Sequence, residues 1–210
     1  MIKFEKAEVW GWEHAIRGMR NPLNSWERSD TVFDGDKLCL GENDVDLMTR
    51  LIRGGAPHRK FLRQIFVSVD ITAPLYWWKE FDTYKVGTTA NSCSTMHKLT
   101  AKEFTIEDFS FEDCNRWTKD VVCSCIINAL NMNRLKYLET KDKKLWRQMI
   151  QLLPTSYNQK RTVTMTYENL LNMLEYRRGH KLNEWRMFCD WILTLPYGSL
   201  LKEGVGNEQS

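Results

Sequence analysis

The chain has 210 residues, of which 42% are hydrophobic and 27% are charged, and its formal net charge is +3. This composition is typical of a folded globular protein and excludes wholesale disorder, and the length favours one domain over residues 1–210. Lysine and arginine are interleaved with acidic residues along most of the chain. The dense basic stripe of proteins that bind a nucleic-acid polymer is therefore missing.

Cysteine spacing and hydropathy exclude further classes. The six cysteines form neither a CxxC pair nor a spacing typical of zinc, so we expect reduced thiols and no metal. The opening MIKFEKAEVWGW has no apolar core of a secretory leader. No apolar run reaches the roughly 18 residues that a membrane span needs. We therefore expect a soluble, cytoplasmic protein with no membrane partner.

The N-terminal half gives weak signals at first and clearer ones later. Residues 1–10 fit a first strand, but residues 1–40 as a whole are poorly defined, with turn formers at 20–25. From Asp44 to the glycines at 54–55, apolar residues recur at helical spacing, which predicts a helix. A strand, a short buried helix and a polar loop are expected after it, over residues 63–71, 75–87 and 88–97.

The C-terminal half is mainly helical. Helices are expected over residues 109–138, 141–153, 167–178 and 180–195. Pro154 ends the second of these, a strand over 157–165 follows it, and Thr166 is the expected N-cap of the third. Residues 203–210 are poorly defined, and we expect a frayed tail there. The pattern predicts an α+β fold in a single domain, with a mixed sheet packed with helices.

Residues 152–186, with the sequence LLPTSYNQKRTVTMTYENLLNMLEYRRGHKLNEWR, resemble the flavin-dependent thymidylate synthases. In that family a Leu-Pro precedes a strand, an Asn-containing helix that ends in Leu-Arg, and a His that begins another helix. The resemblance implies that Asn172 bonds the flavin ring, that Arg177 contacts the uracil and that His180 lies beside the isoalloxazine. Arg178 would serve the substrate phosphate or a partner subunit.

A second segment, residues 54–98, is similar to the family's turn, strand, Ala-Pro and signature loop. His58 matches the turn histidine, which implies a flavin contact. The signature Arg-His-Arg falls on Thr83-Tyr84-Lys85, so Tyr84 and Lys85 are its only substitutes, and a lysine lacks the forked donors of arginine. The resemblance also implies phosphate or substrate contacts from Glu80, Lys85, Thr88, Asn91, Ser92, Ser94 and Arg147.

The resemblance implies reductive methylation of dUMP to dTMP, a methyltransferase reaction of nucleotide biosynthesis. FAD would be the cofactor of this flavoprotein, NADPH and methylenetetrahydrofolate the co-substrates, and Arg177 and His180 the catalytic residues. The resemblance also implies a homotetramer in which several subunits contribute to each active site. Two alternatives stay open: a non-catalytic nucleotide-binding or assembly protein that keeps the fold without flavin chemistry, and an unrelated α+β interaction protein.

Several of these residues also fit ordinary structural roles. Arg177 and Arg178 suit a solvated helix C-terminus, where the macrodipole favours cations. His180 follows a glycine and suits a cap or a surface position, and His58 suits an exposed loop. Cys93 has no Cys/His arrangement around it that would activate a thiolate, so we do not expect a nucleophile there. Trp77 and Trp78 suit a core or an interface better than a stacking site.

Overall fold

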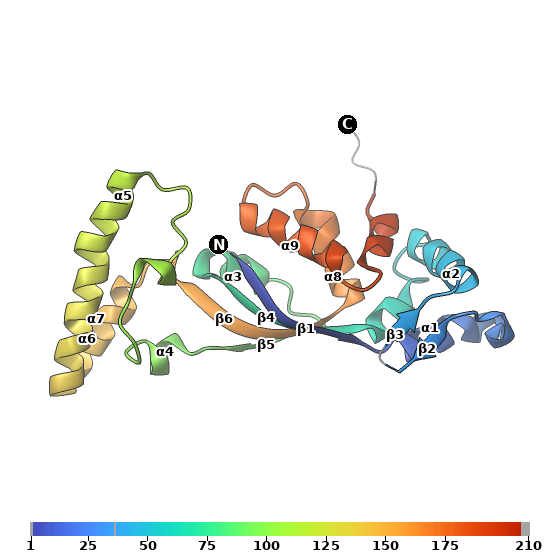
Figure 1. Cartoon of the computed structure of the whole chain (residues 1–210), viewed down its shortest axis with the longest axis horizontal. Coiled ribbons are helices and arrows are strands. Elements are labelled where there is room, and N and C mark those ends of the chain that lie inside the picture. Colours follow the sequence, from blue (N-terminus) through green and yellow to red (C-terminus); the bar gives the residue numbers. More distant parts are fainter. Residues whose placement is uncertain (1, 36, 207–210) are drawn as a thin grey trace. The chain divides into compact units, whose positions relative to one another are not determined.

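The computed structural model describes residues 2–35 and 37–206 (Figure 1). The chain divides into two compact units. The first unit is Met1–Glu5, Asp70–Thr83 and Ala90–Thr162, and the second is Lys6–Val69, Tyr84–Thr89 and Val163–Ser210. The single-domain organisation stays a prediction. The predicted tail falls mostly on residues 207–210, which lie outside the described residues.

The main sheet has the strand order β1-β4-β6-β5, with β1 at Lys3–Trp10, β4 at Phe66–Pro74, β5 at Thr89–Ser92 and β6 at Asn158–Thr166. The α+β class, with a sheet packed against helices, is confirmed, and the sheet is antiparallel rather than mixed. In β4, Val67, Val69 and Ile71 are fully buried in the predicted alternation. The strand starts later than predicted, because residues 60–64 form a 3-10 turn. It also extends further than predicted, to Pro74.

The helices of the first unit are α3 (Leu75–Phe81), α4 (Thr95–Lys98), α5 (Arg116–Val121), α6 (Asn128–Thr140) and α7 (Lys143–Leu152), with a 3-10 turn at Ile106–Asp108. Trp77 and Trp78 are fully buried, so their interpretation as core residues is confirmed. Figure 1 shows α6 and α7 side by side. Both helices contribute to an apolar core of Leu99, Phe104, Phe109, Val122, Ile127, Leu130 and Met149.

Two expectations for the first unit are wrong. The polar loop predicted over residues 88–97 contains β5 and α4, because Ser94 caps α4 by accepting a hydrogen bond from the His97 amide at 3.1 Å. The helix predicted from residue 109 starts at Arg116, where Asn115 accepts from the Thr118 amide at 2.8 Å. It also contains a π-helical turn at Val122–Ile127, which the apolar spacing did not predict.

The second unit holds α1 (Trp12–Arg20), α2 (Glu42–Arg53), α8 (Tyr167–Arg177) and α9 (Asn183–Thr194). Short elements complete it: 3-10 turns at Asn21–Leu23, Trp26–Arg28, Lys60–Gln64 and Gly198–Gly204, and a hairpin of β2 (Val32–Asp34) and β3 (Lys37–Cys39). Thr166 caps α8 by accepting from the Asn169 amide, as predicted. The last helix begins at Asn183 rather than at His180.

Candidate functional site

The segment Tyr84–Thr89, which carries the predicted site residues Tyr84, Lys85 and Thr88, is held against the N-terminus of α8. Asn169 accepts hydrogen bonds from the Thr166 amide at 3.0 Å and hydroxyl at 2.8 Å. Its Nδ2 group donates to the Val86 carbonyl at 2.8 Å. Gly87 makes this approach possible, since it has φ +74° and a Cβ there would lie 3.0 Å from Asn169 Oδ1. Asn169 therefore bonds both the N-cap of α8 and the segment.

The same segment is also tied to the C-terminus of α8. Arg177 Nε donates to the Tyr84 hydroxyl at 2.8 Å. The guanidinium carbon of Arg177 lies 4.7 Å from the Trp185 ring centroid and 5.5 Å from that of Tyr84. Arg177 thus contacts two aromatic rings, one from the segment and one from α9, which holds its side chain in one orientation.

His180 lies near the same tryptophan. Its ring centroid is 6.3 Å from that of Trp185, and its Nδ1 atom accepts from the Leu182 amide at 3.1 Å. Because Nδ1 accepts, the neutral ring carries its proton on Nε2. His180 thus makes a local contact in the turn before α9, beside the ring that Arg177 contacts.

Asn172 belongs to a different cluster. Its Oδ1 atom accepts from Arg59 Nη2 at 3.2 Å, while Arg59 Nε donates to Glu168 Oε1 at 3.2 Å. Arg59 and Glu168 are buried, and Glu168 Oε2 has no hydrogen-bond partner among the described residues. Asn172 and Arg177 are five positions apart, roughly 140° around a helix, so they project from different sides of α8.

The turn before β4 presents a residue that the sequence did not single out. His58 is exposed and the adjacent Arg59 is buried, so Arg59 supplies the internal cation of this turn. The only sequence feature that could have indicated Arg59 is its position within the basic run of residues 58–60. Trp185 was missed as well, although it lies inside the matched segment of residues 152–186.

The other predicted residues of the second unit differ in exposure. Lys85 and Arg178 are exposed, whereas Thr88 is half-buried. The Thr88 hydroxyl is buried and has no hydrogen-bond partner in the part of the chain that the structure describes. Such a group favours a polar ligand atom or a water molecule beside it.

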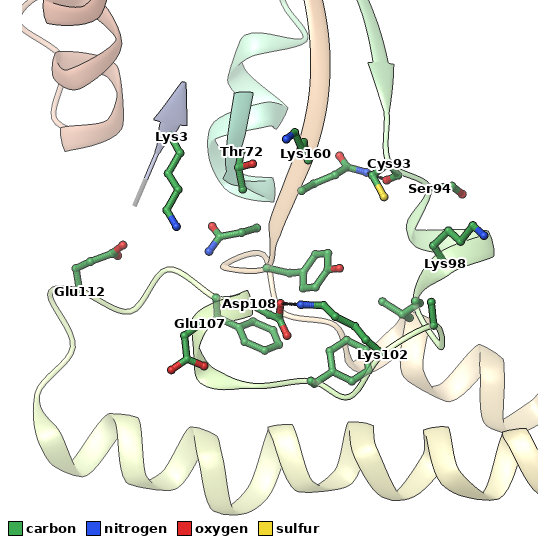
Figure 2. A pocket seen from close by; sticks show the side chains of 17 residues that line it. Lys3, Thr72, Cys93, Ser94, Lys98, Lys102, Glu107, Asp108, Glu112 and Lys160 are labelled. Atoms are coloured by element: carbon green, nitrogen blue, oxygen red, sulfur yellow. Dashed lines mark hydrogen bonds and ion pairs between the residues drawn. The ribbon is translucent and has the colours of Figure 1, made fainter. Parts of the chain in front are cut away.

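Five predicted substrate residues belong to the first unit. Glu80 is half-buried on α3, Asn91 and Ser92 are exposed on β5, Ser94 caps α4, and Arg147 is exposed on α7. Of these five, only Ser94 lines a cavity of about 700 Å³ in the first unit (Figure 2).

This cavity combines an aromatic wall with a charged rim. Phe104, Phe109 and Tyr157 form the aromatic wall, and the Tyr157 ring lies 5.7 Å from that of Phe109. Burial raises the pKa of the Tyr157 hydroxyl, and the negative charge of Asp108 adds to the rise. The lysines and carboxylates labelled in Figure 2 include an ion pair of Lys102 with Asp108. A flat, negatively charged molecule suits such a lining.

Residues 2–35 and 37–206 contain neither a metal-binding cluster nor a membrane-spanning helix. No group of three or more His, Cys, Asp or Glu side chains is placed to hold a metal ion. None of the helices in this part of the chain combines the length and the apolar character needed to cross a bilayer.

The fold defined above is that of the flavin-dependent thymidylate synthases. Two structures of the Helicobacter pylori enzyme ThyX with FAD and dUMP match it, with TM-scores of 0.68 and 0.69 and identities of 18% and 17%. They cover 96% and 99% of this chain and 100% of their own. A UMP/dUMP methylase, PolB from Streptomyces cacaoi, bound with 5-Br dUMP, matches with a TM-score of 0.60 at 11% identity, over 97% of this chain and 92% of its own. No protein-family profile and no curated protein matches the sequence.

Proposed function

We propose that this chain is a dUMP-methylating enzyme of the flavin-dependent type, which uses FAD to make dTMP. The observation that carries the proposal is the placement of Arg177 against Tyr84 and Trp185, on a fold that matches nucleotide-methylating proteins over nearly its whole length. A guanidinium whose plane is fixed by aromatic rings suits the planar, oxygen-rich edge of a pyrimidine. Methylenetetrahydrofolate would supply the carbon and NADPH the reducing equivalents.

The residues of the second unit fit a flavin. Asn172 uses its carbonyl oxygen for Arg59, which leaves its Nδ2 group to donate to a ring carbonyl. The buried Thr88 hydroxyl and the exposed Lys85 lie on the segment tied to α8. When bound, FAD would supply the electrons for reducing the transferred one-carbon unit. Asn172 and Thr88 would orient the ring, and Lys85 would neutralise phosphate.

The first unit contains a cavity of its own that suits an anion. Ser94 lines this cavity together with Lys98, whose exposed side chain carries a positive charge. A hydroxyl and an ammonium group can hold a phosphate, though with less directional contact than an arginine fork. We therefore expect this cavity to bind the phosphate group of a nucleotide weakly.

The test is ligand binding by the purified chain. Added FAD should give a yellow protein, and dUMP should raise its melting temperature. Arg177→Lys keeps the charge but removes the forked donors. We therefore expect the affinity for dUMP to fall about tenfold or more, and a tenfold loss corresponds to about 1.4 kcal/mol of binding free energy. Arg186→Lys, an exposed change on α9, is the matched control. Equal dUMP affinity in the wild type and Arg177→Lys would remove the proposed role of Arg177.

A second candidate function is a protein that binds the nucleotide without flavin chemistry. The replacement of the signature Arg-His-Arg by Thr83-Tyr84-Lys85 favours it, since Tyr84 is engaged with Arg177. Stabilisation by dUMP together with no uptake of FAD would select this alternative. Formation of dTMP from dUMP in the presence of FAD, NADPH and methylenetetrahydrofolate would exclude it.

A further inference from the structure

Another cavity of the first unit, with a volume of about 580 Å³, is lined by α4 and by the paired helices α6 and α7. Its lining residues come from these helices and from the segment after α4, and they are Met96, His97, Thr100, Tyr137, Lys143 and Trp146. All of them belong to the same compact unit. None of them lines the cavity of Figure 2, so the two cavities have separate walls.

Two aromatic rings form part of the wall. Trp146 Nε1 donates to the Met96 carbonyl at 3.0 Å, which ties the indole of α7 to α4. Tyr137 and Trp146 both pack against the apolar core of the first unit, yet both remain only half-buried. Because the indole N–H already has its acceptor, the part of Trp146 that is left open to the cavity is apolar. Contact with a flat ligand would cover these rings.

The charged side chains of the wall are cationic. Lys143 is the first residue of α7, and His97 lies on α4 and becomes positive when protonated. Both side chains are exposed, and neither forms an ion pair within residues 2–35 and 37–206. None of the described residues that line the cavity carries a carboxylate. Asp142 precedes Lys143, but its Oδ1 atom caps α7 by accepting from the Lys144 amide at 2.9 Å.

The size of the cavity favours one ring system with one charged group. A volume of about 580 Å³ lies within the usual range for small-molecule sites. Lys141 Nζ lies 5.9 Å from the ring centroid of Tyr137, which places a third cation beside the aromatic wall. A lysine ammonium donates charge-assisted hydrogen bonds to carboxylate and phosphate oxygens. Aromatic walls beside cations thus suit a molecule that combines a ring with an anionic group.

We propose that this cavity binds a planar aromatic anion, whose ring lies against Trp146 and Tyr137 and whose charged group is held by Lys143 and His97. Aromatic carboxylates and aromatic phosphates share this chemistry. The site does not depend on the proposed function, because none of its residues is assigned there to FAD or dUMP.

Binding is tested with the full chain and four probes in titration calorimetry. The compounds 2-naphthoate and 2-naphthyl phosphate carry a ring and a negative charge. In contrast, 2-naphthylmethylamine carries the same ring with a positive charge, and inorganic phosphate carries the charge without the ring. We expect at least one of the two aromatic anions to bind about tenfold tighter than the amine and than phosphate. Equal or weaker binding of both aromatic anions would overturn the proposal.

Charge variants then locate the anionic group. Lys143→Met removes the ammonium and keeps a similar side-chain length at an exposed helix position, so folding should be unaffected. It should weaken binding of the aromatic anion about three- to tenfold, and Lys143→Arg should restore most of the loss. Lys144→Met is the matched control, because Lys144 is the next exposed lysine of α7 and does not line the cavity. Equal affinities of Lys143→Met and Lys144→Met would overturn the proposed contact.

The cavity of Figure 2 gives the alternative result a clear form, since Lys98 lines it and does not line the proposed site. If Lys98→Met weakens binding while Lys143→Met leaves it unchanged, the anion lies in that other cavity and the proposed site is wrong.

The ring contact has its own measurement, which needs no change in the wall. The indole N–H resonance of Trp146, assigned in NMR spectra by its loss in Trp146→Phe, should shift when the wild type is saturated with 2-naphthoate. An unshifted Trp146 resonance at saturation would show that the ring lies elsewhere and would overturn the proposal.

Discussion

The Nε atom of Arg177 lies 2.8 Å from the hydroxyl oxygen of Tyr84, across an interval of 93 residues. Tyr84 stands where the resemblance places the centre of the Arg-His-Arg signature, and Arg177 ends α8. This one contact joins the two segments that carry the resemblance to the flavin-dependent thymidylate synthases, and it sets the orientation of the proposed uracil-binding side chain.

Tyr84→Phe tests this contact, since it keeps the ring and removes the acceptor. We expect the free energy of unfolding to fall by about 0.5–1.5 kcal/mol, the usual net value of one hydrogen bond. We also expect weaker dUMP binding, because Arg177 loses one of its constraints. Urea unfolding and a dUMP titration measure the two effects. Tyr176→Phe, at a 72% exposed position of α8, is the control, and identical results for both variants would contradict the prediction.

Gly87→Ala tests the approach of the signature segment to α8. The substitution places a Cβ 3.0 Å from Asn169 Oδ1 at a residue with φ +74°. Gly55→Ala provides the control, because Gly55 has φ +83° and no atom within 4 Å of the added Cβ. Both variants should lose about 1–2 kcal/mol of stability from the left-handed backbone. Gly87→Ala should lose more unfolding free energy than Gly55→Ala, as measured by urea unfolding. An equal loss in both variants would show that the Asn169 side chain moves away from the added Cβ at no cost.

Asp44→Asn tests the buried ion pair with Arg20. Burial disfavours the charged carboxylate, but hydrogen bonds from Thr31, Ser29 and Arg20 outweigh it and lower the pKa of Asp44. Its stabilising effect is therefore present above the unfolded pKa of about 3.9 and is lost as the pH falls through the lower folded value. At pH 7 we expect Asp44→Asn to cost about 3–5 kcal/mol.

The pH dependence and a surface control check this assignment. The difference in unfolding free energy between the wild type and Asp44→Asn should shrink as the pH falls below about 4. Asp46→Asn removes an ion pair with Arg50 in which both side chains are 66% exposed, so it should cost less than about 1 kcal/mol. A difference that is constant from pH 7 to pH 3 would contradict the charged state of Asp44.

Cys189 should be the least reactive thiol of the chain. Burial raises the pKa of its thiol to about 11, with a further rise from Asp190, while Arg178 and Arg177 act in the opposite direction. Because the pKa is raised, the reactive thiolate forms only at high pH in the folded chain. Iodoacetamide at pH 8 should label the exposed Cys39, Cys93 and Cys125 first and Cys189 only after unfolding, as read by mass spectrometry. Labelling of Cys189 as fast as Cys125 would contradict its burial.

The α+β class and most of the elements could be predicted from local patterns. The alternation in β4 and the cap at Thr166 depend on neighbours a few residues away, so spacing alone indicates them. The prediction from local pattern was wrong where a distant strand or an N-cap residue determines the secondary structure. Residues 89–92 form a strand because β6 lies beside them, and Asn115 starts the helix that spacing placed earlier.

The candidate site shows the same division. The order of residues in one segment predicted Asn172, Arg177 and His180 as site residues, and the structure places Asn172 with Arg59 and the other two beside Trp185. The sequence did not determine that Arg59 rather than His58 turns inward, nor that Trp185 meets Arg177, since both depend on which helices pack together.

The sequence by itself determined the α+β class and the order of most elements, because periodicity and breakers act within one or two turns of the chain. The tertiary structure alone decided which polar groups are satisfied, because hydrogen-bond partners come from distant segments. Arg20 illustrates this, because its burial against Asp44, with Nη2 left unpaired within the described residues, exists only in the folded chain.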